Sequence, residues 1–260
     1  NSIFFNVTTK GVKSYGELPL TSVLTYSISG KTIQKEENVV NPDYFERLRF
    51  GLNVGPGYLV ASSKNAEDLM VGQGFSSDQA KSYYRDMKLG ISVNADLSFM
   101  ITPFYGAGIK YKFFNTSSSM EGFVDPRDRV NLFYTNYSEK IYVNYAGASF
   151  FYQQFIGSQK SLRLNYTYSL GLALYRNEAE YLNGYYLLTG KNIGADLSFG
   201  LEYFITHYFS VGAELSAFYS SLRKIKISDG VNTSNVKLDK KNYENLSRLN
   251  FSAGIRLYLW

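Results

Sequence analysis

Apolar and polar residues alternate along two neighbouring stretches of the chain, which predicts two β-strands joined by a tight turn. The odd positions of residues 193–205 and of residues 209–219 are apolar or aromatic, while the opposite positions include Asp196, Glu202 and Glu214. Side chains alternate across a strand, so each stretch has one apolar face and one polar face. Each run exceeds ten residues, about the length that a tilted strand needs to cross a bilayer.

The same alternation recurs in six other stretches and predicts eight strands in total. The stretch 140–155 is the least regular, because residues 146–151 suit either face. The predicted strands cover residues 47–62, 87–101, 104–115, 140–155, 161–176, 191–205, 209–220 and 249–260.

The lengths of the connections support this count of strands. Short links around residues 102, 157 and 207 alternate with long ones, which cover residues 63–86, 116–139, 177–190 and 221–244. Short turns at one end and long loops at the other are typical of outer-membrane barrels. The sequence therefore predicts an all-β protein: an eight-stranded antiparallel up-and-down transmembrane β-barrel over residues 46–260.

Residues 1–45 differ from the rest of the chain. Residues 2–9 and 22–28 read as short strands, and residues 31–43 as a polar connector. Two strands cannot bury a core alone, so we expect a short periplasmic β segment with further residues before Asn1. This stretch loosely resembles the second half of a small periplasmic β-domain that precedes barrels in one group of Gram-negative bacteria.

Composition narrows the class further. No run of 18 apolar residues exists, which excludes helical membrane spans. A mean hydropathy of −0.21 is compatible with a barrel, because half of each strand faces a polar lumen. The 24 Tyr and 19 Phe suit the aromatic girdles of such barrels. The absence of Cys excludes disulfides and thiolate metal sites. The net charge of +5 comes without a basic run interleaved with aromatics, so no nucleic-acid partner is expected.

The end of the chain carries the most specific motif. Gly254 is followed by hydrophobic residues three and five positions later, Leu257 and Leu259, and then by the aromatic Trp260. This end resembles the C-terminal assembly signal of outer-membrane barrels, except that the aromatic residue comes one position later. Residues 46–260 resemble small eight-stranded outer-membrane β-barrel proteins, the porin-like group that includes the outer membrane protein A and X types.

This resemblance implies a location and a set of partners. It places the chain in the outer membrane of a Gram-negative bacterium, with the N-terminal segment and the C-terminus in the periplasm. It implies insertion by the barrel-assembly machinery and contact with outer-membrane lipid and lipopolysaccharide. Other outer-membrane proteins are further expected partners.

Charged residues at inward-facing positions form the first candidate site. An eight-stranded barrel is just wide enough for side chains to fill, and buried charges must pair or cost several kcal/mol each. We therefore expect a salt-bridged, closed lumen, with a conducting or ligand-holding lumen as the alternative. The ten residues are Arg49, Lys88, Lys110, Lys112, Arg163 and Arg256 against Asp96, Asp196, Glu202 and Glu214.

Two further features are candidate sites of chemistry. His207 is the only histidine, and its place in a predicted short turn favours a structural role, so no catalytic residue, metal or cofactor is expected. Gly55, Pro56 and Gly57 interrupt a predicted strand. Proline cannot donate a ladder hydrogen bond, so we expect a bulge there, or alternatively a weakened seam that gives a lipid or a partner lateral access.

The long loops also carry aromatic residues, which either form a partner surface or pack on each other above the barrel. They are Phe75, Tyr83, Tyr84, Phe133, Tyr134, Tyr181, Tyr185 and Tyr186.

These features favour a non-enzymatic barrel, a structural or accessory subunit that binds a partner through its outer loops or lipid-facing wall. The first alternative is a narrow pore for small solutes or ions, motivated by the excess of positive charge at inward positions. The second is a lipid-modifying enzyme, motivated by barrel size and Pro56. A fold alone does not choose among them.

Overall fold

The computed structural model describes residues 25–28, 31–34, 46–124, 133–156, 161–181, 184–240 and 243–259. The chain divides into two compact units, Asn1–Phe45 and Glu46–Trp260. In the first unit, β1 (Thr25–Ile28) and β2 (Lys31–Gln34) form an antiparallel pair. The prediction of a connector over residues 31–43 is therefore wrong at its start, where β2 lies. The predicted strand 2–9 lies outside the described residues.

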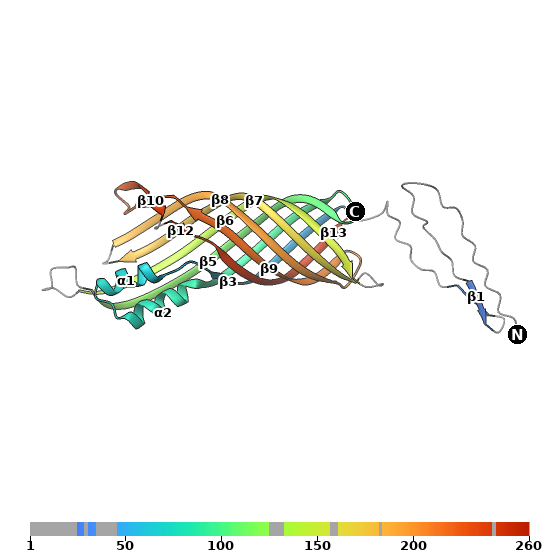
Figure 1. The fold of residues 1–260 in the computed structure, drawn as a ribbon, viewed down its shortest axis with the longest axis horizontal. Helices are drawn as coiled ribbons and strands as arrows, with labels where there is room; N and C mark the ends of the chain where they lie inside the picture. Colours follow the sequence, from blue (N-terminus) through green and yellow to red (C-terminus); the bar gives the residue numbers. More distant parts are fainter. Residues whose placement is uncertain are drawn as a thin grey trace. The chain divides into compact units, whose positions relative to one another are not determined.

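The second unit is a closed ring of eight antiparallel strands (Figure 1). Each strand pairs with the next along the chain, and β13 pairs with both β9 and β3, which closes the ring. The predicted eight-stranded antiparallel barrel is confirmed. Its strands are β3 (Leu48–Leu59), β4 (Leu89–Met100), β5 (Tyr105–Val124), β6 (Phe133–Ile156), β7 (Leu162–Tyr181), β8 (Gly184–Phe204), β9 (Phe209–Leu222) and β13 (Arg248–Leu259).

The two faces of the ring have opposite chemistry. Outward side chains are apolar and exposed, as at Ile109 (63% exposed) and Ile193 (67%), whereas inward charges such as Lys112 are fully buried. A protein surrounded by water does not expose a continuous apolar wall around a charged interior, but a barrel surrounded by lipid does. The wall therefore faces a bilayer.

The predicted loops 116–139 and 177–190 are wrong over much of their length, because the strands continue into them. Ladder pairs run from β5 to β6 as far as Val124 opposite Phe133, and from β7 to β8 as far as Tyr181 opposite Gly184. The predicted loop 221–244 contains β10 (Lys224–Ser228) and β11 (Thr233–Lys237), a hairpin that adds to the edge of β8, and is followed by β12 (Glu244–Asn245).

The predicted loop 63–86 holds two helices, α1 (Lys64–Gly72) and α2 (Ser77–Lys88). A capping box starts α2: the Ser76 hydroxyl accepts from the Gln79 N–H, and the Gln79 side chain accepts from the Ser76 N–H. Because the helix continues to Lys88, the strand begins only at Leu89. The prediction that Lys88 points into the lumen is therefore wrong, and its side chain is half-buried at the helix end. Neither helix is long and apolar enough to span a membrane.

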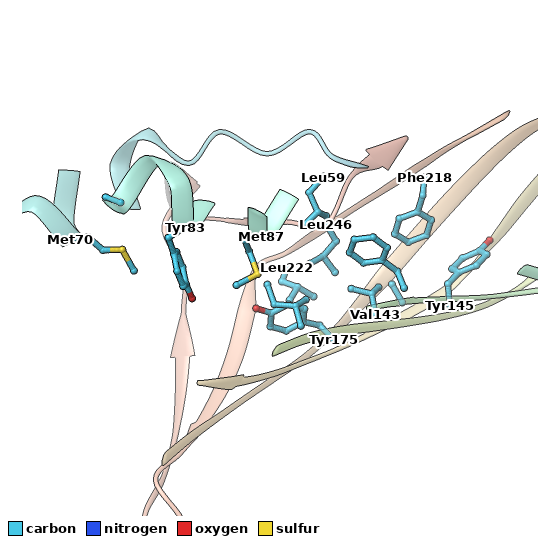
Figure 2. Packing of buried hydrophobic residues seen from close by; sticks show 14 of the residues in the cluster. Leu59, Met70, Tyr83, Met87, Val143, Tyr145, Tyr175, Phe218, Leu222 and Leu246 are labelled. Atoms are coloured by element: carbon cyan, nitrogen blue, oxygen red, sulfur yellow. The ribbon is translucent and has the colours of Figure 1, made fainter. Parts of the chain in front are cut away.

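Both helices lie at one end of the barrel, which we name the helical end (Figure 1). The opposite, short-turn end carries the turns 101–104 and 205–208. At the helical end, Met70, Tyr83 and Met87 of the helices pack in one apolar cluster with side chains of the barrel strands (Figure 2). The strands contribute Leu59, Phe114, Ile141, Val143, Tyr145, Ala173, Tyr175, Phe218 and Leu222, and Leu246 precedes β13.

The predicted bulge at Pro56 is wrong. Pairing with β4 runs without a break through Gly55, Pro56 and Gly57. Towards β13, Gly57 pairs with Asn250 and Val54 with Ala253, so residues 55–56 stand opposite residues 251–252 and neither strand has an extra residue. Those two positions lack ladder pairs, which fits a proline without an N–H.

The seam beside Pro56 tolerates no added side-chain atom. A Cβ on Gly55 would overlap the backbone of Phe251 and Ser252, whereas a Cβ on Gly200 would meet Ala213 O at an ordinary 3.5 Å. We expect Gly55→Ala to lower the free energy of unfolding by about 1–3 kcal/mol through overpacking. Gly200→Ala is the matched control. Urea unfolding from lipid vesicles, followed by circular dichroism, measures both. Equal effects of the two substitutions would contradict the tight seam.

Candidate functional site in the barrel interior

A cluster of charges centred on Glu202 crosses the lumen near the short-turn end. Arg49 forms ion pairs with Asp96 on the neighbouring strand and with Glu202 across the lumen, the latter at 2.6 Å. Arg256 Nε lies 3.1 Å from the same Glu202 oxygen. The Tyr258 hydroxyl donates to the other Glu202 oxygen at 2.6 Å. Glu202 is 0% exposed, so its charge is balanced wholly by protein groups.

Arg163 covers this cluster at the short-turn end. Its guanidinium lies 3.8 Å from the ring centre of Phe204, 4.7 Å from Phe155 and 4.8 Å from Tyr258. A partly exposed carboxylate, Glu46, approaches it at 3.9 Å. Contacts with ring faces stabilise a desolvated cation. Arg163 is therefore held mainly by aromatic rings.

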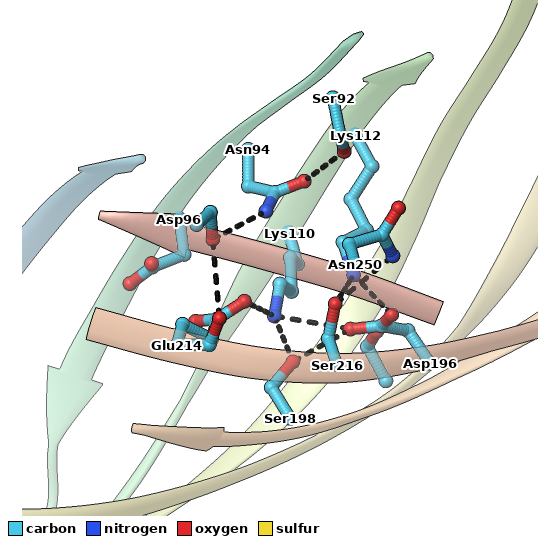
Figure 3. A network of polar contacts seen from close by, with 12 residues as sticks. Ser92, Asn94, Asp96, Lys110, Lys112, Asp196, Ser198, Glu214, Ser216 and Asn250 are labelled. Carbon is cyan, nitrogen blue, oxygen red and sulfur yellow. Dashed lines mark hydrogen bonds and ion pairs between the residues drawn. The ribbon is translucent and has the colours of Figure 1, made fainter. Parts of the chain in front are cut away.

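A second cluster lies one layer further into the barrel (Figure 3). Lys110 Nζ lies 3.0 Å from Asp196 and 3.1 Å from Glu214. Lys112, two residues along the same strand, pairs with the other Asp196 oxygen and donates to the Ser216 hydroxyl at 2.7 Å. All four charged groups are buried. Two lysines and two carboxylates thus form a second closed layer.

Arg248 is the lumen residue that the sequence analysis missed. It is 1% exposed, and its guanidinium lies 4.1 Å from the ring centre of Phe218 and 4.9 Å from that of Phe114. The predicted strand began at residue 249, one position too late. The inward alternation from Arg256 back through even positions reaches Arg248 and was the available signal. With Arg248 in place of Lys88, the buried charged side chains of the described residues are six cationic and four acidic: Arg49, Lys110, Lys112, Arg163, Arg248 and Arg256 against Asp96, Asp196, Glu202 and Glu214.

The other residues singled out from the sequence carry none of these buried charges, although the Gly254 carbonyl accepts from Arg256 Nη1 at 3.0 Å. Gly254, Leu257 and Leu259 all lie in β13, and Trp260 lies outside the described residues. His207 is exposed in the turn between β8 and β9. Within the described ranges, no three His, Cys, Asp or Glu side chains are grouped to hold a metal ion.

Some aromatic residues of the predicted loops pack into the apolar cluster, and others are exposed. Phe75 and Tyr83 are buried in the apolar cluster, and Tyr84 and Tyr181 pack against it. Tyr134, Tyr185 and Tyr186 are exposed. The side chain of Phe133 lies outside the described set.

The closed ring, its charged interior and its apolar wall define the class of this protein. It is a transmembrane β-barrel of the outer-membrane type.

Searches against protein-family models and curated proteins found no match. Among solved structures, the chain is similar to Neisserial surface protein A (14% identity, 82% of this chain and 97% of that chain covered, TM-score 0.44). It is also similar to a major outer membrane protein from Thermus thermophilus (11%, 81% and 98%, TM-score 0.48). A third is the outer membrane protease OmpT from Escherichia coli (10%, 84% and 98%, TM-score 0.42). Identities of 10–14% and TM-scores below 0.5 say nothing about function. The class of this protein follows from its closed ring, charged interior and apolar wall.

Removing the charge of Glu202 tests how far the first cluster stabilises the barrel. Glu202→Gln leaves Arg49 with the Asp96 carboxylate alone and takes the carboxylate from Arg256. We expect a loss of about 3–5 kcal/mol in the free energy of unfolding, as for breaking a buried pair. The measurement is urea unfolding from lipid vesicles.

The control for this variant is Glu178→Gln, which removes a partly exposed pair with Arg176. We expect a change there of at most about 1 kcal/mol. A Glu202→Gln barrel as stable as this control would show that the cluster contributes nothing to stability.

Proposed function

We propose that this protein is a non-enzymatic outer-membrane barrel with a closed lumen, a structural or accessory subunit that binds a partner at its outer end or along its lipid-facing wall. The observation that carries the proposal is the filled interior. Two layers of ion pairs and an apolar cluster follow one another along the axis. With the interior occupied by side chains, the ends and the wall are the surfaces left for function.

The proposed orientation places the helical end outside the cell. Short turns lie on the periplasmic side of outer-membrane barrels and longer connections outside. The short-turn end, the C-terminus and the N-terminal segment would then be periplasmic. In this arrangement the wall contacts outer-membrane lipid, the outer rim meets lipopolysaccharide, and the barrel-assembly machinery inserts the chain. Other outer-membrane proteins are the proposed partners.

Exposed apolar groups near the ends of the long strands support a partner surface. Phe123 of β5 and Tyr134 of β6 stack edge to face with ring centres 5.2 Å apart, and both are exposed. Val231, at the tip of the β10–β11 hairpin, is 91% exposed. Aromatic anchors contribute strongly to protein interfaces.

The absence of enzymatic activity is likewise a proposal. The carboxylates of the two charged layers, Asp96, Asp196, Glu202 and Glu214, are engaged in ion pairs, and a general acid or base needs a group that is free to exchange a proton with a substrate. The narrow pore remains the alternative, because the lumen holds more cationic than acidic residues.

The closed lumen makes a direct electrical prediction. We expect the purified protein in planar lipid bilayers to give no steady conductance in concentrated potassium chloride, because buried side chains form successive layers across the described part of the lumen. An outer-membrane porin in the same lipid is the positive control. Reproducible unitary openings would support the pore instead.

Native mass spectrometry after gentle detergent extraction tests the accessory-subunit proposal. We expect a partner protein in stoichiometric amounts with the wild-type chain, and its loss from the double variant Phe123→Ser/Tyr134→Ser. Tyr208→Ser is the matched control, since Tyr208 is an exposed tyrosine in the turn at the opposite end. A lone barrel from wild-type membranes would argue against a subunit role.

A further inference from the structure

A hollow of about 470 Å³ opens at the helical end, beside the apolar cluster. One side is α1, and the other is formed by inward positions of β6, β7 and β8 together with part of β10. The apolar part of its lining consists of Ala66, Leu69, Met70, Ala179, Leu188 and Ile227. Ligand sites in proteins are typically concave, mostly apolar and of about 300–1,000 Å³. The hollow thus has the size of a small-molecule site.

One carboxylate, that of Glu139, lines the hollow and is held in a fixed position. The Asn177 side-chain amide donates to it at 2.6 Å, the Tyr137 hydroxyl at 2.7 Å and the Tyr83 hydroxyl at 3.1 Å. A carboxylate has about four acceptor positions, so three donors leave capacity for one more. Among the described residues, none of the nine ion pairs involves Glu139.

Tyrosine rings surround this carboxylate. Tyr137 packs edge to face on Tyr83 at 5.3 Å and on Tyr181 at 5.5 Å, and Tyr84 and Tyr186 complete the aromatic lining. Aromatic faces attract cations through their negative quadrupole. Burial, and then the charge of Glu139, raises the pKa of Tyr83 far above its usual value, so its hydroxyl stays protonated as a donor.

The local electrostatics also favour a positive ligand. Burial raises the pKa of Tyr84, and the carboxylates of Glu139, Glu244 and Glu67 raise it further. The Glu139 carboxylate itself lines the hollow, so it attracts a cation there and repels an anion.

We propose that this hollow binds a small organic cation, an amine or quaternary ammonium group on an apolar body. The charged head contacts Glu139 and the tyrosine rings, and the body lies against Leu69, Met70 and Leu188. Anionic and neutral ligands lack one of these two interactions. The site is independent of whether the lumen conducts and of any protein partner.

Isothermal titration calorimetry with benzyltrimethylammonium, on the full chain in lipid nanodiscs, tests the proposal. We expect saturable one-to-one binding by the wild type and at least about tenfold weaker binding by Glu139→Gln, since the substitution keeps the shape and removes the charge. The control is Glu180→Gln, an exposed carboxylate on the adjacent β7 strand. Its affinity is expected to stay within about twofold of the wild type.

Two further measurements complete the test. Phenylacetate, an anion of similar size, is expected not to bind. Ala66→Trp adds a large side chain to the hollow from α1 while the Glu139 carboxylate is kept, and it is expected to abolish binding of benzyltrimethylammonium. It decides the result if Glu139→Gln does not fold. The proposal is overturned by absence of saturable binding to the wild type, by equal binding of phenylacetate, or by unchanged affinity in Glu139→Gln or Ala66→Trp. Neither conductance nor co-purification enters these readouts.

Discussion

Closure of the ring by β13 is the constraint on which the rest of the structure depends. A bilayer offers no water to a free strand edge, so a spanning sheet has to close on itself. When β13 pairs with β3 and β9, it brings Arg256 beside the Glu202 carboxylate that Arg49 reaches from β3. The charged layer therefore exists only in the closed ring. Closure in turn is favoured by the layer, because an open barrel would leave these charges facing lipid or unpaired.

The interior changes its chemistry along the axis, and side chains of a different kind fill each layer. Aromatic rings and ion pairs fill the short-turn end, lysine–carboxylate pairs fill the middle, and apolar side chains fill the helical end. The last layer is possible because α1 and α2 cover it and bury Met70, Tyr83 and Met87. Without the helices, an apolar interior at that end would face water. The helices are thus part of the core of the barrel.

The sequence predicted the ring well because a period of two residues is a strong signal for a strand with two unlike faces. The same rule placed the inward charges apart from Lys88 and Arg248, both at strand boundaries, where the period gives least information. It treated 140–155 as the least regular strand because residues 146–151 suit either face; the structure buries Phe151 and exposes Phe150. It missed the helices, whose limits depend on a capping box and on tertiary burial. It predicted a bulge at Pro56. In the structure the proline is accommodated without one, because β3 keeps its pairs with β4 there and lacks pairs only with β13.

The alternation of apolar and polar residues could not predict the hollow at the helical end, because the groups that surround its carboxylate come from three elements far apart in the chain. Tyr83 comes from α2, Glu139 from β6 and Asn177 from β7, and only the extended strands bring them together. The sign of the charge also changes along the axis. The buried charges of the described residues are six cationic and four acidic, whereas the charged residue that lines the hollow is Glu139. A cation that binds in the hollow therefore meets both an apolar barrier and a positive interior below it. Binding at this end does not imply transport, and a barrel can recognise a small cation while remaining closed to it.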